Sequence, residues 1–196
     1  MNFKLELMKN EDLAKFKKDI QEAFQKGFED VYGPTEGTIL PEEDINQSLN
    51  AKGAIAYKAI VDGDFVGGAI VVIDSETQYN HLHLLYVKYG IQTKGIGKLI
   101  WDEIERLHPE TAVWETCTPC FEKRNIHFYV NKCKFHIVKY IREMNEEGFI
   151  GDGGDGMFTF QKVMKWFLNS YLSFRNRGMQ NTSRVCKFRY RGMQNI

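Results

Sequence analysis

Residues 87 to 98 read Val-Lys-Tyr-Gly-Ile-Gln-Thr-Lys-Gly-Ile-Gly-Lys, and this stretch decides the fold. It follows an apolar run at 82–87 that predicts a buried strand, and apolar residues at helical spacing then predict an amphipathic helix over 96–107. The first amides of a helix have no intrahelical partner, and Gly95 and Gly97 remove the Cβ atoms that would keep a phosphate away from them. We therefore predict an anion site, suited to a pyrophosphate, at the start of this helix.

Two common nucleotide motifs do not fit this turn. A Walker loop carries Ser or Thr after its Gly-Lys pair to hold magnesium, whereas Leu99 follows Gly97-Lys98. A dinucleotide fingerprint needs a third glycine where this chain has Ile100. The pattern that fits is Gln-x-x-Gly-x-Gly at 92–97, which resembles the acetyl-CoA signature of the GNAT superfamily of N-acetyltransferases.

A second motif lies at 125–135, Asn-Ile-His-Phe-Tyr-Val-Asn-Lys-Cys-Lys-Phe. It is similar to the GNAT pattern Asn-x-x-Ala-x-x-Phe-Tyr-x-x-x-Gly-Phe with a shorter middle. On a helix, Asn125 and Tyr129 are four residues apart and share a face. The resemblance implies that Asn125 contacts the pantetheine arm of the cofactor and that Tyr129 lies near its sulfur. Phe128 is interpreted as an ordinary core residue.

The resemblance implies acetyl-CoA as co-substrate and a set of cofactor-binding residues without any metal ion. These residues are Tyr86, Val87, Gln92, Thr93, Lys94, Gly95, Ile96, Gly97, Lys98, Asn125 and Tyr129. It also implies that the backbone N–H of Val87 donates to the thioester carbonyl as negative charge develops there.

Acyl transfer to an amine needs a base, because a primary amine with a pKa of about 10.4 is mostly protonated at neutral pH. Counting back from Val87, His81 falls where some family members carry a glutamate base, and a pKa near ~6.5 suits proton abstraction. His83, on the same strand face, and Glu115, acting directly or through water, are the alternatives, with His81 preferred. Tyr129 is the candidate donor to the departing thiolate. Direct attack on the thioester requires no covalent enzyme intermediate.

Local patterns predict alternating strands and helices, with a hairpin at Asp62-Gly63-Asp64 and a bulge at Gly67-Gly68. Strands are expected at 3–8, 54–61, 65–73, 82–87, 111–117, 135–141 and 157–164, and helices after 10–12, after Pro41, at 96–107 and at 120–132. This order resembles the α+β GNAT fold, a mixed, mostly antiparallel central sheet of six to seven strands flanked by about four helices.

The 196 residues suit one domain at 1–166 followed by a tail at 167–196. The first 166 residues hold all 26 acidic residues and 20 of the 26 basic ones, so nucleic-acid binding by the domain is not expected. The tail has no acids and contains Phe-Arg-x-Arg-Gly-Met-Gln-Asn twice, at 174–181 and 188–195. The alternatives for it are a nucleic-acid or membrane-surface arm, a dimer-swapping extension leading to a homodimer, or an artefact of cloning or reading frame, which is preferred.

No apolar N-terminal run indicates a signal peptide and no stretch is long enough to cross a bilayer, so we expect a cytoplasmic protein without membrane contact. Cys117-Thr-Pro-Cys120 lacks the second pair of a zinc site and the strand-to-helix context of a redox motif. Acidic residues at 29–44, without an intervening Lys or Arg, would attract a cationic amine, although acids also favour the first turn of helices.

The sequence therefore predicts an N-acetyltransferase that moves the acetyl group of acetyl-CoA to a primary amine of a small molecule or peptide. Two other classes stay open. One is a non-catalytic acyl-CoA-binding regulatory module, and the other is a nucleic-acid-associated protein acting through the basic tail.

Overall fold

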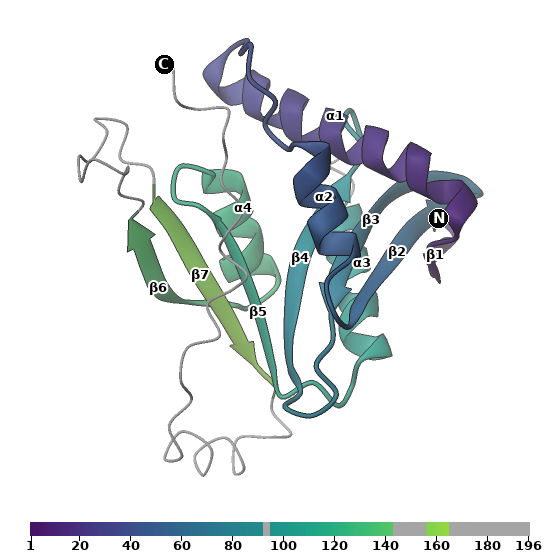
Figure 1. Cartoon of the computed structure of the whole chain (residues 1–196), viewed down its shortest axis with the longest axis vertical. Coiled ribbons are helices and arrows are strands. Elements are labelled where there is room, and N and C mark those ends of the chain that lie inside the picture. The colour runs from purple at the N-terminus through teal and green to yellow at the C-terminus, as the bar shows by residue number, and fades with distance from the viewer. Residues whose placement is uncertain (92–94, 143–155, 165–196) are drawn as a thin grey trace. The chain divides into compact units, whose positions relative to one another are not determined.

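The structure is a computed structural model that describes residues 1–91, 95–142 and 156–164 (Figure 1). A short 3₁₀ turn at Asn10–Asp12 precedes the first helix, and a π-helical turn at Phe128–Lys132 follows the fourth. The strands are β1 Phe3–Leu7, β2 Ala54–Val61, β3 Asp64–Val72, β4 Tyr79–Val87, β5 Val113–Pro119, β6 His136–Arg142 and β7 Gly156–Val163. The helices are α1 Leu13–Tyr32, α2 Glu42–Leu49, α3 Ile96–Leu107 and α4 Lys123–His127.

The seven strands form one mixed sheet in the order β1-β2-β3-β4-β5-β7-β6. The β1/β2, β2/β3, β5/β7 and β6/β7 pairs are antiparallel. The β4/β5 pair is parallel, and its register joins Tyr79–His81 to Val113–Glu115. The predicted α+β class, with a mostly antiparallel sheet and four helices, is thereby confirmed.

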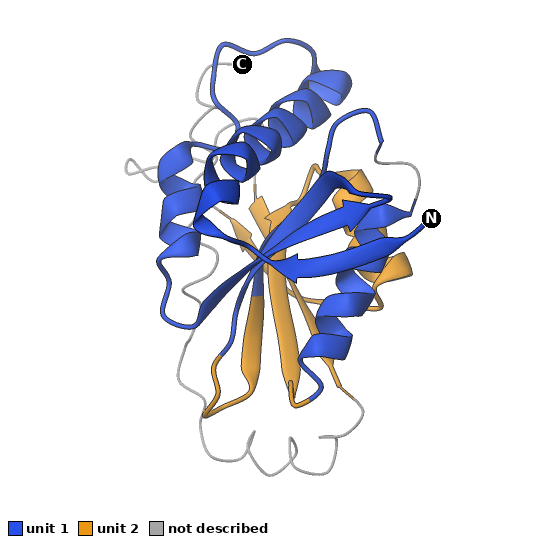
Figure 2. Cartoon of the chain, turned by 90° about the vertical axis from the view of Figure 1, so that its right-hand side faces the viewer, with its two compact units in different colours: residues 1–73, 82–109, 188–196 blue, residues 74–81, 110–187 orange. Residues whose placement is uncertain are grey.

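The chain divides into two compact units, which Figure 2 shows in blue and orange. The described part of unit 1 comprises 1–73, 82–91 and 95–109, and that of unit 2 comprises 74–81, 110–142 and 156–164. The predicted boundary at residue 166 lies outside the described residues and stays a prediction.

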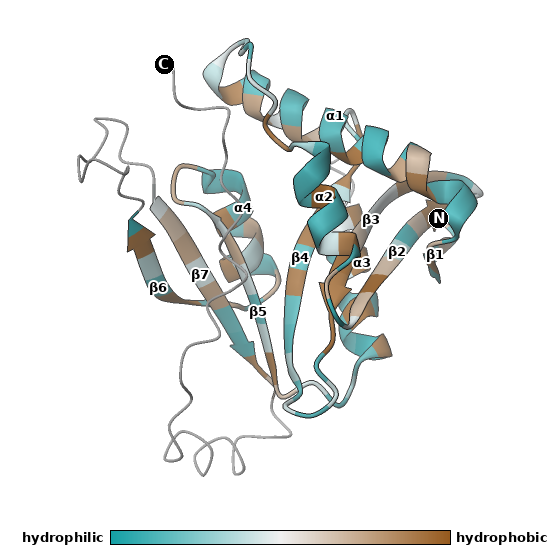
Figure 3. Cartoon of the chain, viewed as in Figure 1, coloured by the Kyte–Doolittle hydropathy of each residue, from teal (hydrophilic) through white to brown (hydrophobic). Residues whose placement is uncertain are grey.

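In unit 1, α1 and α3 pack on opposite faces of β3. A Cβ on Gly68 would lie 2.8 Å from the Phe16 ring of α1, whereas a Cβ on Gly67 would lie 3.3 Å from the Ile100 side chain of α3. The α1 side is an apolar core whose fully buried members are Phe16, Ile20, Ile45 and Ile70. Figure 3 shows hydrophilic and hydrophobic residues interleaved along α1, as expected of an amphipathic helix with one buried face.

The hairpin predicted from glycines is present, and the bulge predicted at Gly67-Gly68 lies one residue earlier, at Val66. Asp62 and Gly63 have φ angles of 52° and 97°, the positive values of the tight turns that join antiparallel strands. The β2/β3 register shifts by one residue where Ala59 pairs with Gly67 and Ile60 pairs with Phe65. Val66, the extra residue of this bulge, uses its carbonyl to accept a hydrogen bond from the Lys88 amide at 2.8 Å.

The predicted helix at 120–132 in unit 2 is partly wrong. The α-helix begins only at Lys123, and its last turn is π-helical, with the Cys133 amide donating to the Phe128 carbonyl at 3.0 Å. Helix periodicity alone does not distinguish α from π hydrogen bonding, because the two differ by one residue over a single turn.

Candidate active site

The helix α3 begins directly after a glycine, as the sequence predicts. Gly95 caps the helix at φ 76°, in the left-handed region, and a Cβ there would meet nothing within 4 Å. The amides of Lys98 and Leu99 donate to the Gly95 carbonyl at 3.0 and 3.2 Å. The amides of Ile96 and Gly97 therefore precede the first amide that is bonded within the helix. A diphosphate group would fit the open space beside Gly95, where it could accept hydrogen bonds from these amides.

The charged part of the predicted cradle is only partly described. Gln92, Thr93 and Lys94 lie outside the described residues. Lys98 forms an ion pair with Asp102 one helical turn later, so its positive charge is balanced in unit 1. Backbone amides, more than lysine charge, are thus the described groups that fit an anion.

Tyr86 and Val87 end β4 just before this turn. The Tyr86 side chain is 3% exposed and its ring meets Phe16 edge-on at 5.2 Å, so it lies in the core against α1. Burial raises the pKa of the Tyr86 hydroxyl. A Cβ on Gly67 would lie 2.5 Å from the Tyr86 carbonyl oxygen and 3.1 Å from Val87 Cα. Because Gly67 has no side chain, the β4 backbone at Tyr86 and Val87 can lie this close to β3. The Val87 amide is the group that we predict to contact the thioester.

In unit 2, Asn125 and Tyr129 both reach β5, as their shared helix face predicts. The Asn125 amide lies 3.4 Å from Thr118 Oγ1, and the Tyr129 hydroxyl is hydrogen-bonded by the Thr116 side chain. The ring of Tyr129 packs against Phe135 and Phe160, with centroids at 5.8 and 5.5 Å. Burial raises the pKa of Tyr129, which keeps its hydroxyl protonated as a hydrogen-bond donor.

Two of the three candidate bases, His81 and Glu115, lie beside each other on neighbouring strands. His81 of β4 is in register with Glu115 of β5, and Glu115 is in register with Gln161 of β7. His81 Nδ1 lies 3.7 Å from Glu115 Oε1, and both side chains are nearly buried. The sequence predicted these two residues as rival bases, whereas the structure makes them a pair.

Two residues that the sequence did not single out complete this group. The Tyr79 hydroxyl donates to Glu115 Oε2, and Gln161 Nε2 donates to the same oxygen at 2.8 Å. Gln161 Nε2 also donates to the Tyr79 hydroxyl, and the Tyr79 ring lies 5.3 Å from the His81 ring. We name Tyr79, His81, Glu115 and Gln161 the carboxylate cluster. Its members come from three strands, so no local motif predicts it.

The environment of His81 favours the neutral imidazole. Burial lowers the pKa of His81, and the nearby carboxylates of Glu115 and Asp74 oppose that shift only in part. A neutral imidazole is the form that accepts a proton.

The carboxylate cluster and Tyr129 lie on opposite faces of the β5/β7 pair. Side chains alternate along a strand, so Glu115 and Thr116 point to different faces, as do Phe160 and Gln161. Glu115 and Gln161 hold the cluster, whereas Thr116 and Phe160 contact Tyr129.

The third candidate base, His83, contacts a different element. His83 Nδ1 lies 3.3 Å from the hydroxyl of Ser48, a fully buried residue of α2. This contact gives His83 a packing role between β4 and α2 within unit 1.

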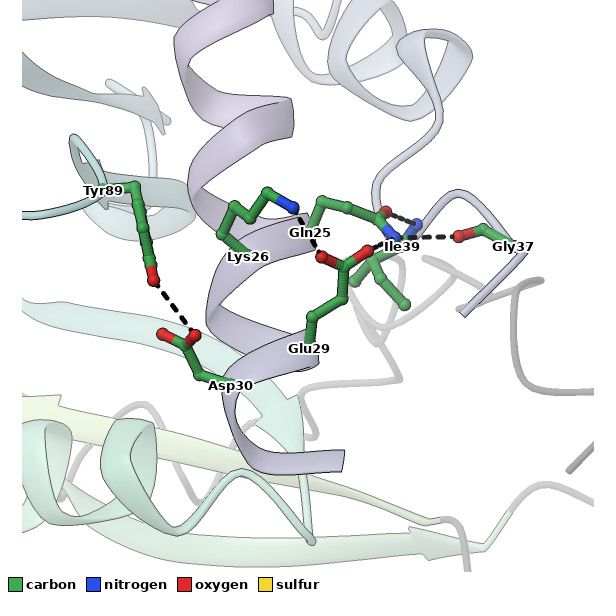
Figure 4. Close-up of polar contacts among 7 residues, drawn as sticks. All are labelled: Gln25, Lys26, Glu29, Asp30, Gly37, Ile39 and Tyr89. Carbon is green, nitrogen blue, oxygen red and sulfur yellow. Dashed lines mark hydrogen bonds and ion pairs between the residues drawn. The ribbon is translucent and has the colours of Figure 1, made fainter. Parts of the chain in front are cut away.

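Some of the acidic residues at 29–44 have polar partners within unit 1. Figure 4 shows Glu29 beside Lys26 and Gln25, and Asp30 beside Tyr89. Glu29 lies 2.8 Å from Lys26 Nζ and 2.9 Å from Gln25 Nε2, and Asp30 accepts a hydrogen bond from the Tyr89 hydroxyl at 3.0 Å. Gln25 also ties α1 to the segment that follows it, through Gly37 and Ile39. Three further acids, Glu42, Glu43 and Asp44, form the first turn of α2, where Glu42 pairs with Lys17 of α1 at 2.9 Å. A cationic acceptor stays a prediction. The ion pairs with Lys26 and Lys17 reduce the local negative charge on which that prediction depends.

Cys117 lies in β5, and Cys120 follows the end of that strand at Pro119. Cys117, Cys120 and Cys133 are thiols, and no three His, Cys, Asp or Glu side chains of residues 1–91, 95–142 and 156–164 gather as metal ligands. Within those same ranges, every helix is too short or too polar to cross a membrane.

The sheet order and the glycine-capped helix after β4 agree with the fold that the sequence resemblance implies. The chain belongs to the acetyltransferase (GNAT) family, whose model matches residues 17–135. A Bacillus subtilis (strain 168) protein described as uncharacterized protein YrkN is 44% identical over 172 residues, covering 82% of this chain and 93% of that protein.

Solved structures of low sequence identity share the fold. The PaiA N-acetyltransferase of Thermoplasma acidophilum, solved with coenzyme A, has a TM-score of 0.59 at 18% identity and covers 84% of this chain and 100% of its own. A GNAT family acetyltransferase of Elizabethkingia anophelis, solved with acetyl-CoA bound, has a TM-score of 0.62 at 13% identity, over 83% and 99% of the two chains. Membership of the family confirms the resemblance, and an acetyltransferase is the function class that it defines.

Proposed function

We propose that this protein transfers the acetyl group of acetyl-CoA to a primary amine of a small molecule or peptide, by direct attack in a ternary complex. The observation that carries the amine acceptor is the buried His81, whose lowered pKa keeps it neutral and able to take a proton from nitrogen. Family membership and the Gly95 turn support the cofactor.

Each part of the cofactor has residues that would hold it. The amides at the start of α3, with Gly95 leaving space for them, would hold the diphosphate, and Asn125 would hold the pantetheine arm. When bound, acetyl-CoA supplies an acetyl group activated as a thioester. The Val87 N–H would donate to the carbonyl oxygen while the C–N bond forms and the C–S bond breaks.

Two protons move in this reaction. His81 would accept the proton that the amine loses, and Tyr129 would donate a proton to the departing sulfur. Their placement on opposite faces of the β5/β7 pair supports this division, because the amine approaches the carbonyl carbon from one side and the thiolate departs on another. The raised pKa of Tyr129 keeps its hydroxyl protonated until the thiolate forms.

The test is an assay of a panel of amines that detects the thiol of released coenzyme A. We expect turnover with at least one amine, and His81→Ala should lower kcat by roughly 100-fold or more, the usual contribution of a positioned base. His136→Ala, an exposed histidine of β6, is the matched control and should retain full turnover.

Two results would contradict the proposal. Absence of thiol release with every amine, in protein that binds acetyl-CoA, would favour a non-catalytic acyl-CoA-binding module. Full turnover by His81→Ala would keep the enzyme but remove His81 as its base.

A further inference from the structure

The two oxygens of Glu115 have different neighbours. Oε2 accepts hydrogen bonds from the Tyr79 hydroxyl and from Gln161 Nε2, the latter at 2.8 Å. Oε1 faces His81 Nδ1 at 3.7 Å, a distance that allows charge attraction but exceeds a hydrogen bond. The carboxylate is therefore held from one side and turned toward the imidazole on the other.

Tyr79 and Gln161 also fix each other. Gln161 Nε2 donates a hydrogen bond to the Tyr79 hydroxyl, and that hydroxyl in turn donates a hydrogen bond to Glu115. The three groups close a ring that spans β4, β5 and β7, and Glu115 is 7% exposed. Such a closed network leaves the carboxylate little freedom to rotate.

We infer that Tyr79 and Gln161 are positioning residues for proton removal, which hold Glu115 so that it acts through His81 and is not itself the base. The catalytic meaning of this inference rests on the proposed function. In this arrangement Glu115 stabilises the imidazolium that forms when His81 takes a proton, while the two donors keep the carboxylate from closing onto the ring.

The inference predicts opposite shifts in the titration of His81. The groups that face His81 are Tyr79 on its own strand, Glu115 on β5, and Asp74 before β4, with Gln161 and its register neighbour His136 beyond Glu115. Glu115→Gln removes an attraction that favours the imidazolium, so the pKa of His81 should fall further. Tyr79→Phe frees the carboxylate to approach His81 Nδ1, so the pKa of His81 should rise by about one unit, the low end of the effect of an adjacent opposite charge.

The experiment is an NMR pH titration of the histidine ring resonances in the full chain, with His81 assigned from the His81→Ala spectrum. Tyr79→Phe and Gln161→Leu should move the His81 midpoint up, Glu115→Gln should move it down, and Tyr140→Phe, a tyrosine of β6 outside the carboxylate cluster, should leave it unchanged. Because kcat/KM rises as His81 loses its proton, the acid limb of the pH profile should shift in the same directions.

This titration requires no substrate, so it reports on the inference even if no acceptor amine is found. Unchanged midpoints in Tyr79→Phe and Gln161→Leu would overturn it. So would loss of turnover at every pH in Glu115→Gln with His81→Ala unaffected, because Glu115 would then be the base. If Gln161→Leu fails to fold, Tyr79→Phe, which removes one oxygen atom, decides alone.

Discussion

At Tyr129, burial and hydrogen bonding act on the same hydroxyl. Apolar rings surround it, and the Thr116 side chain is its hydrogen-bond partner. Tyr129→Phe keeps the ring and removes the proposed donor to the leaving thiol. We expect kcat to fall by about 100-fold, the lower range for a positioned acid.

The Tyr129 measurement is steady-state release of coenzyme A thiol, compared with Tyr140→Phe as the control. Loss of the Thr116 partner should also cost about 1 kcal/mol of unfolding free energy, measured by denaturant titration. Unchanged kcat in a folded Tyr129→Phe protein would leave Tyr129 as a core residue only.

Single residues of the candidate site can be named from sequence where a local pattern includes them. Tyr129 and Gly95 stand within motifs, and His81 follows from counting along one strand. Tyr79 and Gln161 were not predictable, because they are 36 and 46 residues from the Glu115 that they bind. Their contact depends on strand register, which no local pattern specifies.

At the scale of elements, Gly67 connects the bulge of β3 to the end of β4. Gly67→Ala would place a Cβ 2.5 Å from the Tyr86 carbonyl oxygen, so the two strands must move apart at Val87. We expect a loss of about 1–3 kcal/mol in unfolding free energy, the usual cost of overpacking, together with weaker acetyl-CoA binding.

Gly63→Ala is the matched comparison for Gly67→Ala. Its Cβ would meet nothing within 4 Å, but its φ of +97° strains any other residue. It should therefore lose stability while keeping its affinity for acetyl-CoA, measured by calorimetry. Equal affinities in the two variants would show that the crowding at Gly67 does not reach the backbone that we propose to contact the cofactor.

Element types were predictable because glycines, prolines and apolar periodicity mark them locally. The hairpin at 62–64 and the start of α3 are examples, since both need glycine at positive φ. The π-helical turn at 128–132 was not, because its extra residue per turn leaves the apolar pattern almost unchanged.

At the scale of the whole molecule, the sheet order explains why the site could be only half predicted. β7 pairs with both β5 and β6, so the last described strand lies between two earlier strands and not at the edge of the sheet. That insertion brings Gln161 beside Glu115, and it is a property of long-range pairing rather than of local sequence. The turn proposed to hold the cofactor joins one strand and one helix that are adjacent in sequence, so the start of that helix was predictable from local pattern.

Cofactor binding should appear as a change in the stability of the whole chain. A ligand that binds the folded state at about 100 times its Kd adds about 2.7 kcal/mol, which corresponds to a rise of roughly 5–10 °C in Tm for a chain of this size. Gly95→Glu would fill the space beside the α3 amides with a negative side chain, so the shift with acetyl-CoA should disappear. Gly33→Glu, another glycine at positive φ with nothing within 4 Å of its Cβ, carries the same charge and similar strain at the end of α1. It should keep the full shift in a thermal unfolding scan, and a shift that survives in Gly95→Glu would place the diphosphate elsewhere.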